Sequence, residues 1–465
     1  MGCSCTPSSH THTTYQNVLL SLLHCSDNPS QSRFQRYVMT LLNKKANQSD
    51  RISDLPANVI DGILGNLKIR DQVRTSILSR KWRYMWTSAP ELCFDNKFFE
   101  RYTYLEGSDH ASVVSKIITD VLMLRNGPIH KFTLSISYDF HYDFKSNFEI
   151  TLENLNMWIP FLSRDIKYLD LVDRWESVHE MPYIVFSCKE LTYFKFGGFH
   201  LLIPPHFCGF KRLLELHLYL ARFNSDALES LVSGCPFLEK LCIELCEGFQ
   251  YLHISSHTLK VLFIDLLYDV KSICLKKADN LIDFTFEAKH VGLSSLFKSL
   301  PKVKLVGCNK NPYADIIPPT CLACSFNSLK YLKLGVKDLN ETGELLHIVR
   351  VLKSAPSLVK LVIQSYNFFE ATRVLDHSEE LECRSCCLKL QIVDISVRTK
   401  SQHAMSLIQF ILANSPLLKT LTFNFDIIKL DALELHRILY RISQDLLGME
   451  RASPRAHVKL LNCGN

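Results

Sequence analysis

The sequence predicts an α/β chain in which three short N-terminal helices precede a long stack of strand–helix repeats. Three observations support this fold class. Apolar residues recur at helical spacing between Asp50 and Ala89. Beyond residue 125, an apolar-x-x-apolar-x-apolar frame returns at intervals of mostly about 19 to 32 residues. Several helical stretches between these frames end at a proline, which stops a helix and directs the chain into the next strand.

The first segment, residues 50–92, is expected to form the three helices. Pro56 suits a first helical turn, because the N–H group that proline lacks has no partner there. Asp71 is expected to cap the second helix. In the second helix, Val73, Ile77 and Leu78 are expected to face inward, and the third helix, after Ser79, carries Trp82, Met85 and Trp86. About forty residues cannot bury this much apolar surface alone, so the pattern predicts that another surface covers it.

The segment carries Leu55-Pro56, Val59-Ile60, Ile63-Leu64, Val73, Ser76 to Ser79 and Trp82-Arg83-x-x-Trp86. In these residues it resembles the F-box of plant F-box proteins. The resemblance implies binding to the Skp-type adaptor of an SCF-type cullin–RING ubiquitin ligase, and through it to the cullin and RING subunits. It assigns the adaptor interface to Leu55, Pro56, Ile60, Ile63, Leu64, Val73, Trp82 and Trp86. The alternative is a helical cap that packs only on the following domain.

Residues 1–49 are expected to be a disordered leader. Their first residues, Met1 to Thr6, fit the loose N-myristoylation pattern, with Gly2 as the acceptor and Cys3 and Cys5 as candidate palmitoylation sites. One acyl chain gives only marginal membrane binding, so the cysteines would decide whether the chain is anchored. The alternatives are an unmodified leader and a start at Met39.

The segment 93–125 joins the helical module to the repeats. It is richer in aromatic residues than a flexible tether, with Phe94, Phe98 and Phe99 among them. It ends in an amphipathic stretch, Ala111 to Leu124, that predicts a helix. We therefore expect this link to pack against the first repeats and to hold the helical module in place.

Repeats are expected over residues 126–380, and the frame continues beyond them. The last two apolar positions of each frame alternate, as a half-buried strand requires. The frames begin at Ile129, Ile166, Leu191, Leu213, Leu238, Leu259, Leu281, Leu300, Leu329, Leu358, Leu390 and Leu418. Helical stretches such as Asp226 to Val232 lie between them. This arrangement resembles irregular leucine-rich repeats, which implies a horseshoe-like solenoid with its strands on the concave side.

Residues 381–460 resemble the FBD region of the plant F-box/FBD/LRR-repeat family. The resemblance rests on Cys387 to Ile395, on the helical stretch Leu407 to Leu412 with Ala413 to Leu421 after it, and on Arg451 to Ala456. Physically, this region is expected to form two more strand–helix units that close the open end of the stack.

No catalytic constellation stands out, and we expect a non-catalytic subunit without a cofactor. The seventeen cysteines are scattered and odd in number, which favours reduced, buried thiols. Cys321-x-x-Cys324 and Cys383-x-x-Cys386 suggest zinc, but two whole repeats separate the pairs, and zinc needs four converging ligands. We therefore predict no metal site.

These features together predict a substrate receptor, in which the F-box binds the adaptor and the repeats bind an unknown target protein. No apolar run is long enough for a membrane span, and the expected location is the cytoplasm, the nucleus or both. The alternative is a nucleic-acid-binding or scaffold regulator, suggested by basic residues such as Arg80 and Lys81 within the F-box. We expect no nucleic-acid partner, because a solvated basic face explains these charges and the net charge of +6 is mild.

Overall fold

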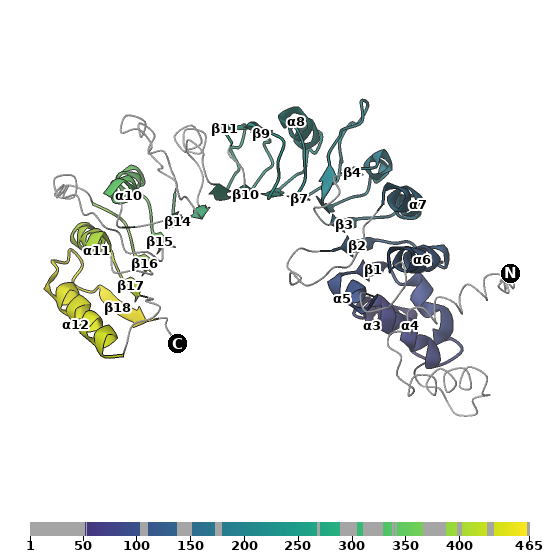
Figure 1. Cartoon of the computed structure of the whole chain (residues 1–465), viewed down its shortest axis with the longest axis horizontal. Coiled ribbons are helices and arrows are strands. Elements are labelled where there is room, and N and C mark those ends of the chain that lie inside the picture. The colour runs from purple at the N-terminus through teal and green to yellow at the C-terminus, as the bar shows by residue number, and fades with distance from the viewer. Residues whose placement is uncertain are drawn as a thin grey trace. The chain divides into compact units, whose positions relative to one another are not determined.

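The computed structural model describes residues 52, 54–102, 110–136, 151–172, 179–266, 270–288, 305–309, 329–336, 339, 342–365, 387–397, 402–425 and 432–462. Figure 1 draws these residues as coloured ribbons. They fall into two compact units, one ending at Arg222 and the other beginning at Phe223. The division lies inside the stretch assigned to repeats, and each unit contains a series of parallel strands.

The first unit begins with short helices and then alternates strands with helices. Its helical module comprises α3 (Ala57–Gly65), α4 (Ile69–Arg74) and the 3₁₀ segments η1 (Thr75–Ile77) and η2 (Trp82–Ser88). The elements that follow are β1 (Glu91–Phe94), α5 (Asn96–Phe99), η3 (Glu100–Tyr102), α6 (His110–Met123), β2 (Lys131–Ser135), α7 (Leu152–Leu162), β3 (Tyr168–Val172), η4 (Tyr183–Ser187), β5 (Tyr193–Gly197) and β7 (Glu215–Tyr219), with a small strand pair, β4 (His179–Glu180) and β6 (Phe199–His200).

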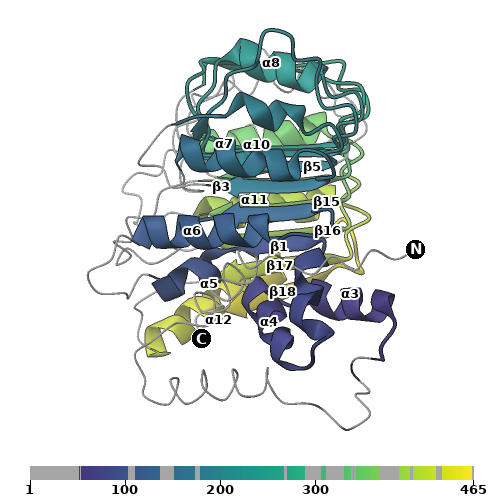
Figure 2. The same cartoon turned by 90° about the vertical axis from the view of Figure 1, so that its right-hand side faces the viewer.

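Strands β1, β2, β3, β5 and β7 pair in chain order, and every pair is parallel. Helices α6 and α7 lie side by side on one face of this sheet (Figure 2). Two side-chain hydrogen bonds join them: Trp158 Nε1 donates to Thr119 Oγ1 at 2.9 Å, and Asn154 Nδ2 donates to Ser115 Oγ at 2.6 Å. The opposite face of the sheet carries the side chains that alternate with the buried ones.

The second unit repeats the same plan. Its main-sheet strands are β8 (Lys240–Glu244), β10 (Val261–Leu266), β12 (Asp283–Ala288), β13 (Leu305–Asn309), β14 (Tyr331–Val336), β15 (Lys360–Ser365), β16 (Ile392–Val397), β17 (Thr420–Phe425) and β18 (His457–Asn462), paired in this order and parallel throughout. Its helices are α8 (Ser225–Ser233), α10 (Thr342–Ser354), α11 (Gln402–Asn414) and α12 (Ala432–Gly448), and β9 (Tyr251–Ser255) pairs with β11 (Ser272–Lys276).

Apolar residues of the frames form the core between strands and helices. In strand β8, for example, Leu241 and Ile243 are both fully buried, and their neighbours in register on β10, Leu262 and Ile264, are buried as well. The described helices α8, α10 and α11 end just before Pro236, Pro356 and Pro416. The strand–helix–proline order read from the sequence is therefore present in the described repeats.

One frame is out of register. The sequence favoured Leu300, Val303 and Leu305, but β13 begins at Leu305 and pairs Phe284 with Val306. The predicted frame is therefore wrong at this strand. Apolar residues at 303, 305 and 306 fit two registers, and only pairing with the neighbouring strand selects one of them.

The chain near residue 451 links α12 to the last strand. Arg451 Nη2 donates to the carbonyl of Leu446 at 3.1 Å, which satisfies a free carbonyl at the end of α12. Ser453 Oγ donates to the carbonyl of Leu418 at 2.8 Å and joins this turn to the preceding repeat. These two contacts give a structural role to the motif Arg451 to Ala456.

Candidate functional site

Helix α3 separates its apolar residues onto two faces. Pro56 immediately precedes the helix. Ile60 and Leu64, four residues apart, are 1% and 0% exposed, whereas Val59 and Ile63, also four residues apart, are 41% and 39% exposed. Residues at this spacing share a helix face, so α3 has a buried row and an exposed apolar row.

The buried row forms the core of the helical module. Ile60 and Leu64 pack with Trp82 and Ala89, and the partly buried Leu55 and Met85 cover this cluster. The indole Nε1 of Trp82 donates to the carbonyl of Ile52 at 3.1 Å. Trp82 therefore fixes the turn before α3 and the helix at the same time.

Helix α4 is joined to α3 by polar contacts. Gln72 Nε2 donates to the carbonyls of Leu64 and Leu67, both at 2.9 Å, and so satisfies acceptors at the end of α3. Val73 is fully buried beside it. The predicted cap at Asp71 is wrong: α4 begins at Ile69, and the Asp71 carboxylate instead lies 3.1 Å from Arg74 Nη1.

The third predicted helix is a 3₁₀ segment, η2, and η1 is 3₁₀ as well. The change of helical period after Arg74 alters which residues point inward. Trp86 stays fully buried, but Leu78, expected in the core, is 48% exposed. Ser76 Oγ donates to the Arg83 carbonyl at 3.1 Å and holds the two 3₁₀ segments together.

The end of the module is bonded to the segment that follows α6. Arg125 Nη1 donates to the Trp86 carbonyl at 2.7 Å, and the Asn126 N–H donates to the Thr87 carbonyl at 3.0 Å. Burial lowers the pKa of the Arg125 guanidinium to about 10, so it stays charged at neutral pH. The Trp86 carbonyl also accepts the Ala89 N–H at 3.3 Å, and the charge on Arg125 strengthens the second hydrogen bond at this junction.

The chain then enters the sheet without a spacer. Strand β1, directly after the module, buries Leu92 and Phe94 and pairs with β2. The Asp95 carboxylate forms an ion pair with Lys68 and accepts a hydrogen bond from the Phe98 N–H, which caps α5. The link expected to pack against the first repeats therefore contains the first strand itself, which begins within the segment assigned to the helical module.

The eight residues assigned to the adaptor interface divide into two groups. Ile60, Leu64, Val73, Trp82 and Trp86 are buried inside the unit. Pro56 and Ile63 are exposed, and Leu55 is half-buried. The exposed apolar residues Ile52, Val59 and Leu78 were not among the eight. Val59 could have been found, because it shares the helical row of Pro56 and Ile63.

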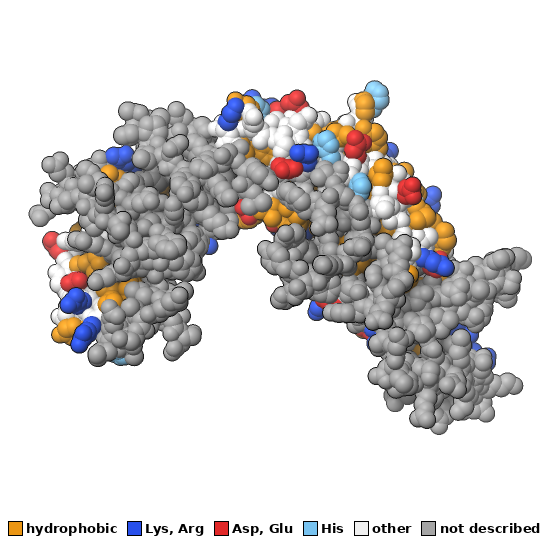
Figure 3. Space-filling view, in the orientation of Figure 1, with side chains coloured by type: hydrophobic (Ala, Val, Ile, Leu, Met, Phe, Trp, Pro, Cys, Tyr) orange, Lys and Arg blue, Asp and Glu red, His pale blue; other side chains and the backbone are white. Residues whose placement is uncertain are grey.

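Basic side chains near this module include the exposed Arg74, Arg80 and Lys81. Over the described part of the surface drawn in Figure 3, lysine and arginine side chains are interspersed with acidic and hydrophobic ones. This distribution differs from the continuous basic stripe that is typical of nucleic-acid binding.

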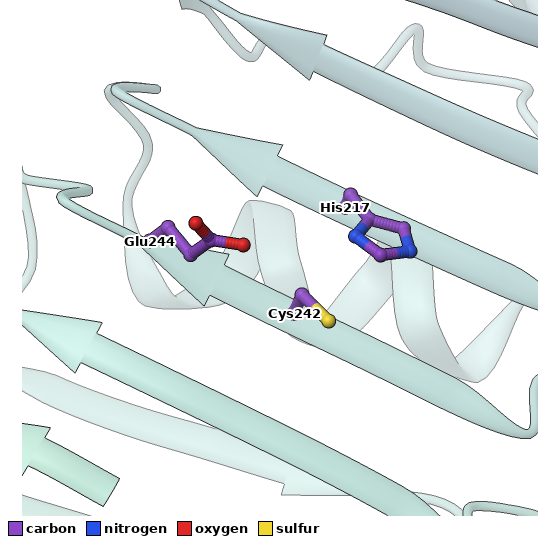
Figure 4. A group of neighbouring side chains, drawn as sticks. All are labelled: His217, Cys242 and Glu244. Carbon is purple, nitrogen blue, oxygen red and sulfur yellow. The ribbon is translucent and has the colours of Figure 1, made fainter. Parts of the chain in front are cut away.

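Possible metal ligands were also considered. Cys321, Cys324, Cys383 and Cys386 lie outside the described residues, as do Gly2, Cys3 and Cys5 of the leader. Figure 4 shows Cys242 and Glu244, two residues apart on β8 and therefore on one face of that strand, together with His217 of β7 in the first unit. Two ligands from one strand are half of a structural zinc set, so β8 alone does not make a metal site. Among the described residues, no helix combines the length and hydropathy of a membrane span.

Comparison with known proteins places these features in one family. The F-box domain model matches residues 52–94, and the model for the LRR repeats of FBD-associated F-box protein At5g56370 matches residues 155–310. The chain is 30% identical over 438 residues to the F-box/FBD/LRR-repeat protein At1g13570 of Arabidopsis thaliana, covering 89% of this chain and 98% of that one. It is 26% identical over 432 residues to the putative F-box/FBD/LRR-repeat protein At1g66290 of the same plant, covering 83% and 89%. The chain therefore belongs to the plant F-box/FBD/LRR-repeat family.

Proposed function

We propose that this protein is the substrate receptor of an SCF-type cullin–RING ubiquitin ligase. The observation that carries the proposal is the exposed apolar row of α3, formed by Val59 and Ile63 and continued by Pro56 immediately before the helix, within a segment that matches the F-box. The module already has its own core of Ile60, Leu64, Trp82 and Ala89. An additional row of large apolar side chains on its surface is typical of a protein–protein interface.

The exposure of the side chains supports a revised set of proposed adaptor contacts. Central apolar anchors dominate the energy of such interfaces, and Pro56, Val59 and Ile63 can reach a partner directly. Leu55 packs at the edge of the core, and we propose that it contributes both to the core and to the adaptor interface. Ile60, Leu64 and Trp82 hold α3 in position through the module's core, and Val73 and Trp86 are buried within the same unit. We propose these five as supporting residues.

The repeats would bind the target protein, and the adaptor would connect it to the cullin and RING subunits. In this role the chain is non-catalytic. Its contribution is positional, because a bound target presents its lysines to the charged conjugating enzyme at a high effective concentration. We propose the cytoplasm or the nucleus as the site of action.

The test is binding of the purified full-length chain to a plant Skp-type adaptor. Val59→Asp or Ile63→Asp should weaken binding by about thirtyfold or more, since losing a central anchor commonly costs ~2 kcal/mol or more. The double variant Leu55→Ala with Pro56→Ala should abolish co-purification. Val59→Asp and Ile63→Asp should each change the thermal midpoint of unfolding only slightly, because the side chains of Val59 and Ile63 are not part of the core.

Phe237→Asp is the matched control. Phe237 is 59% exposed and lies in the second unit, so the same change of an exposed apolar residue to aspartate should leave adaptor binding intact. Native-strength adaptor binding by Ile63→Asp would overturn the assignment of this row. Equal loss in Phe237→Asp would show that the effect is not specific to α3.

A further inference from the structure

A second set of side chains lies on the first unit's sheet, on the face opposite α6 and α7. Strand pairing places Lys131, Tyr168 and Tyr193 in one row across β2, β3 and β5. Asp170 and Lys195 stand side by side in the next row. We call these five residues the Asp170 face. All of them alternate with buried frame residues and therefore point away from the core.

Aromatic rings organise this face. Tyr168 and Tyr193 are stacked with ring centroids 4.0 Å apart and an interplanar angle of 3°. Lys131 Nζ lies 5.1 Å from the Tyr168 centroid, and Lys195 Nζ lies 5.5 Å from the centroid of Tyr219. Aromatic faces attract cations within about 6 Å, so both lysines already have favourable partners on this face.

The glycine of β5 allows Tyr219 to lie close to that strand. A Cβ atom at Gly197 would come within 2.4 Å of the Tyr219 carbonyl oxygen and 3.1 Å of the tyrosine side chain. A separation of 2.4 Å between a Cβ atom and a carbonyl oxygen is too short to occur in a protein, so a residue with a side chain cannot replace Gly197 without a shift of the backbone. Gly197 therefore sets the position of the aromatic ring that receives Lys195.

Asp170 is the unsatisfied group of this face. It is 9% exposed, and its buried Oδ1 accepts no hydrogen bond from the described part of the chain. Lys131 is engaged instead by Glu91, at 3.2 Å. A buried carboxylate oxygen without a donor destabilises the protein that carries it. Such a locally unfavourable residue is typical of a binding site, where the ligand supplies the missing donor.

The charges on this face favour a ligand that is a positively charged hydrogen-bond donor. Carboxylates of Glu91, Asp170 and Glu215 outnumber the ammonium groups of Lys131 and Lys195 on these strands. A guanidinium group is planar, stacks on tyrosine and donates two parallel hydrogen bonds to a carboxylate. Lysine side chains are long and flexible, so Lys131 and Lys195 can swing aside as the guanidinium enters.

We infer that the Asp170 face binds an arginine side chain of the target polypeptide. The face extends across neighbouring parallel strands, and such repeat surfaces are suited to extended protein ligands. This inference extends the proposed receptor role. It rests on that role in one respect, namely that the arginine belongs to the protein to be ubiquitinated. Adaptor binding through α3 does not depend on it, so the two proposals can fail separately.

The test uses the full-length chain bound to its Skp-type adaptor, with immobilised pools of short random peptides as the probe. The pools differ only at a fixed central residue, which is arginine, glutamine or glutamate. The native complex should be retained on the arginine pool about tenfold more than on the glutamine pool, the effect expected of one charged hydrogen bond. Asp170→Asn should abolish that preference, while adaptor content stays unchanged.

Asp283→Asn is the matched control. Asp283 is also a sheet-face carboxylate with a buried, unsatisfied Oδ1 and a pKa raised by burial, but it lies on β12 of the second unit. This variant should keep the arginine preference. Equal retention on the arginine and glutamine pools, or an arginine preference that survives Asp170→Asn, would overturn the inference. Preference for the glutamate pool would also overturn it, because the lysines would then be the binding groups.

Discussion

At the scale of single residues, neighbouring positions on α3 have opposite roles. Ile60 and Leu64 fill the module's core, whereas Val59 and Ile63 face outward. The sequence shows that all four lie at helical spacing, but spacing alone cannot assign a face when both faces are apolar. Only the packing of Trp82 against Ile60 and Leu64 decides which row is inside.

A pair of alanine variants tests this division. Ile60→Ala should lower the free energy of unfolding of the first unit by about 2–4 kcal/mol, because it leaves a cavity in a packed core. Ile63→Ala truncates the same kind of side chain on the surface and should change the free energy of unfolding by less than about 0.5 kcal/mol. Urea unfolding of the two variants measures the difference. Equal destabilisation would mean that the faces of α3 are assigned incorrectly.

Asp170 gives the stability a predictable pH dependence. Burial raises the pKa of its carboxyl from 3.8 to about 6, and the charges of Lys195 and Lys131 oppose this rise. Because the folded-state pKa is raised, the folded protein binds the proton more tightly than the unfolded chain does. The associated stability is complete below about pH 4 and is lost as the pH rises through about 6.

Asp170→Asn should remove that dependence. Asparagine resembles the neutral acid, so the variant should be more stable than the native chain at about pH 7.5, with a difference on the order of 2–3 kcal/mol. The difference should shrink at about pH 5. Burial raises the pKa of Tyr168 and of Tyr193, which stack on the same face as Asp170, so both stay neutral in this range. Thermal unfolding of both proteins at the two pH values checks this, and a gap independent of pH would contradict it.

At the scale of elements, the repeats were the most predictable part of the molecule. Each frame combines a strand period with a proline stop, so two independent signals agree. Strands without a clear frame were missed. Among them are β1, read as the end of the helical module and a link, the side pairs β4 with β6 and β9 with β11, and β18, after the last predicted frame. Helix α7 was not predicted; Pro160 lies inside it, and a proline normally argues against a helix at that point.

The frame of β8 provides the test at this scale. Leu241→Asp would place an unpaired carboxylate in a fully buried position, at a cost of several kcal/mol against a small total stability. We expect insoluble protein or unfolding of the second unit. Lys240→Asp, at the half-buried preceding position on the outer face, is the control and should remain soluble. A soluble Leu241→Asp protein with an unchanged melting curve would contradict the assigned strand register.

At the scale of the whole molecule, the helical module and the first repeats belong to one compact unit. The Arg125–Trp86 contact and the pairing of β1 with β2 cross the point where a separate F-box would be expected to end. The sequence suggested this through the aromatic residues of the link, but it could not show that a strand begins there. Removal of residues 93–125 would therefore damage both the module and the sheet, and point variants of the full chain are the better tools.

The most direct test of the receptor role is affinity purification of the full-length chain from plant cells with the proteasome blocked. The native protein should bring down the Skp-type adaptor together with ubiquitin-modified target proteins. Ile63→Asp should lose the adaptor and retain the same target proteins without their ubiquitin, because target binding lies on the repeats. An Ile63→Asp protein that still carries the adaptor, or that retains targets with undiminished ubiquitin, would contradict the account.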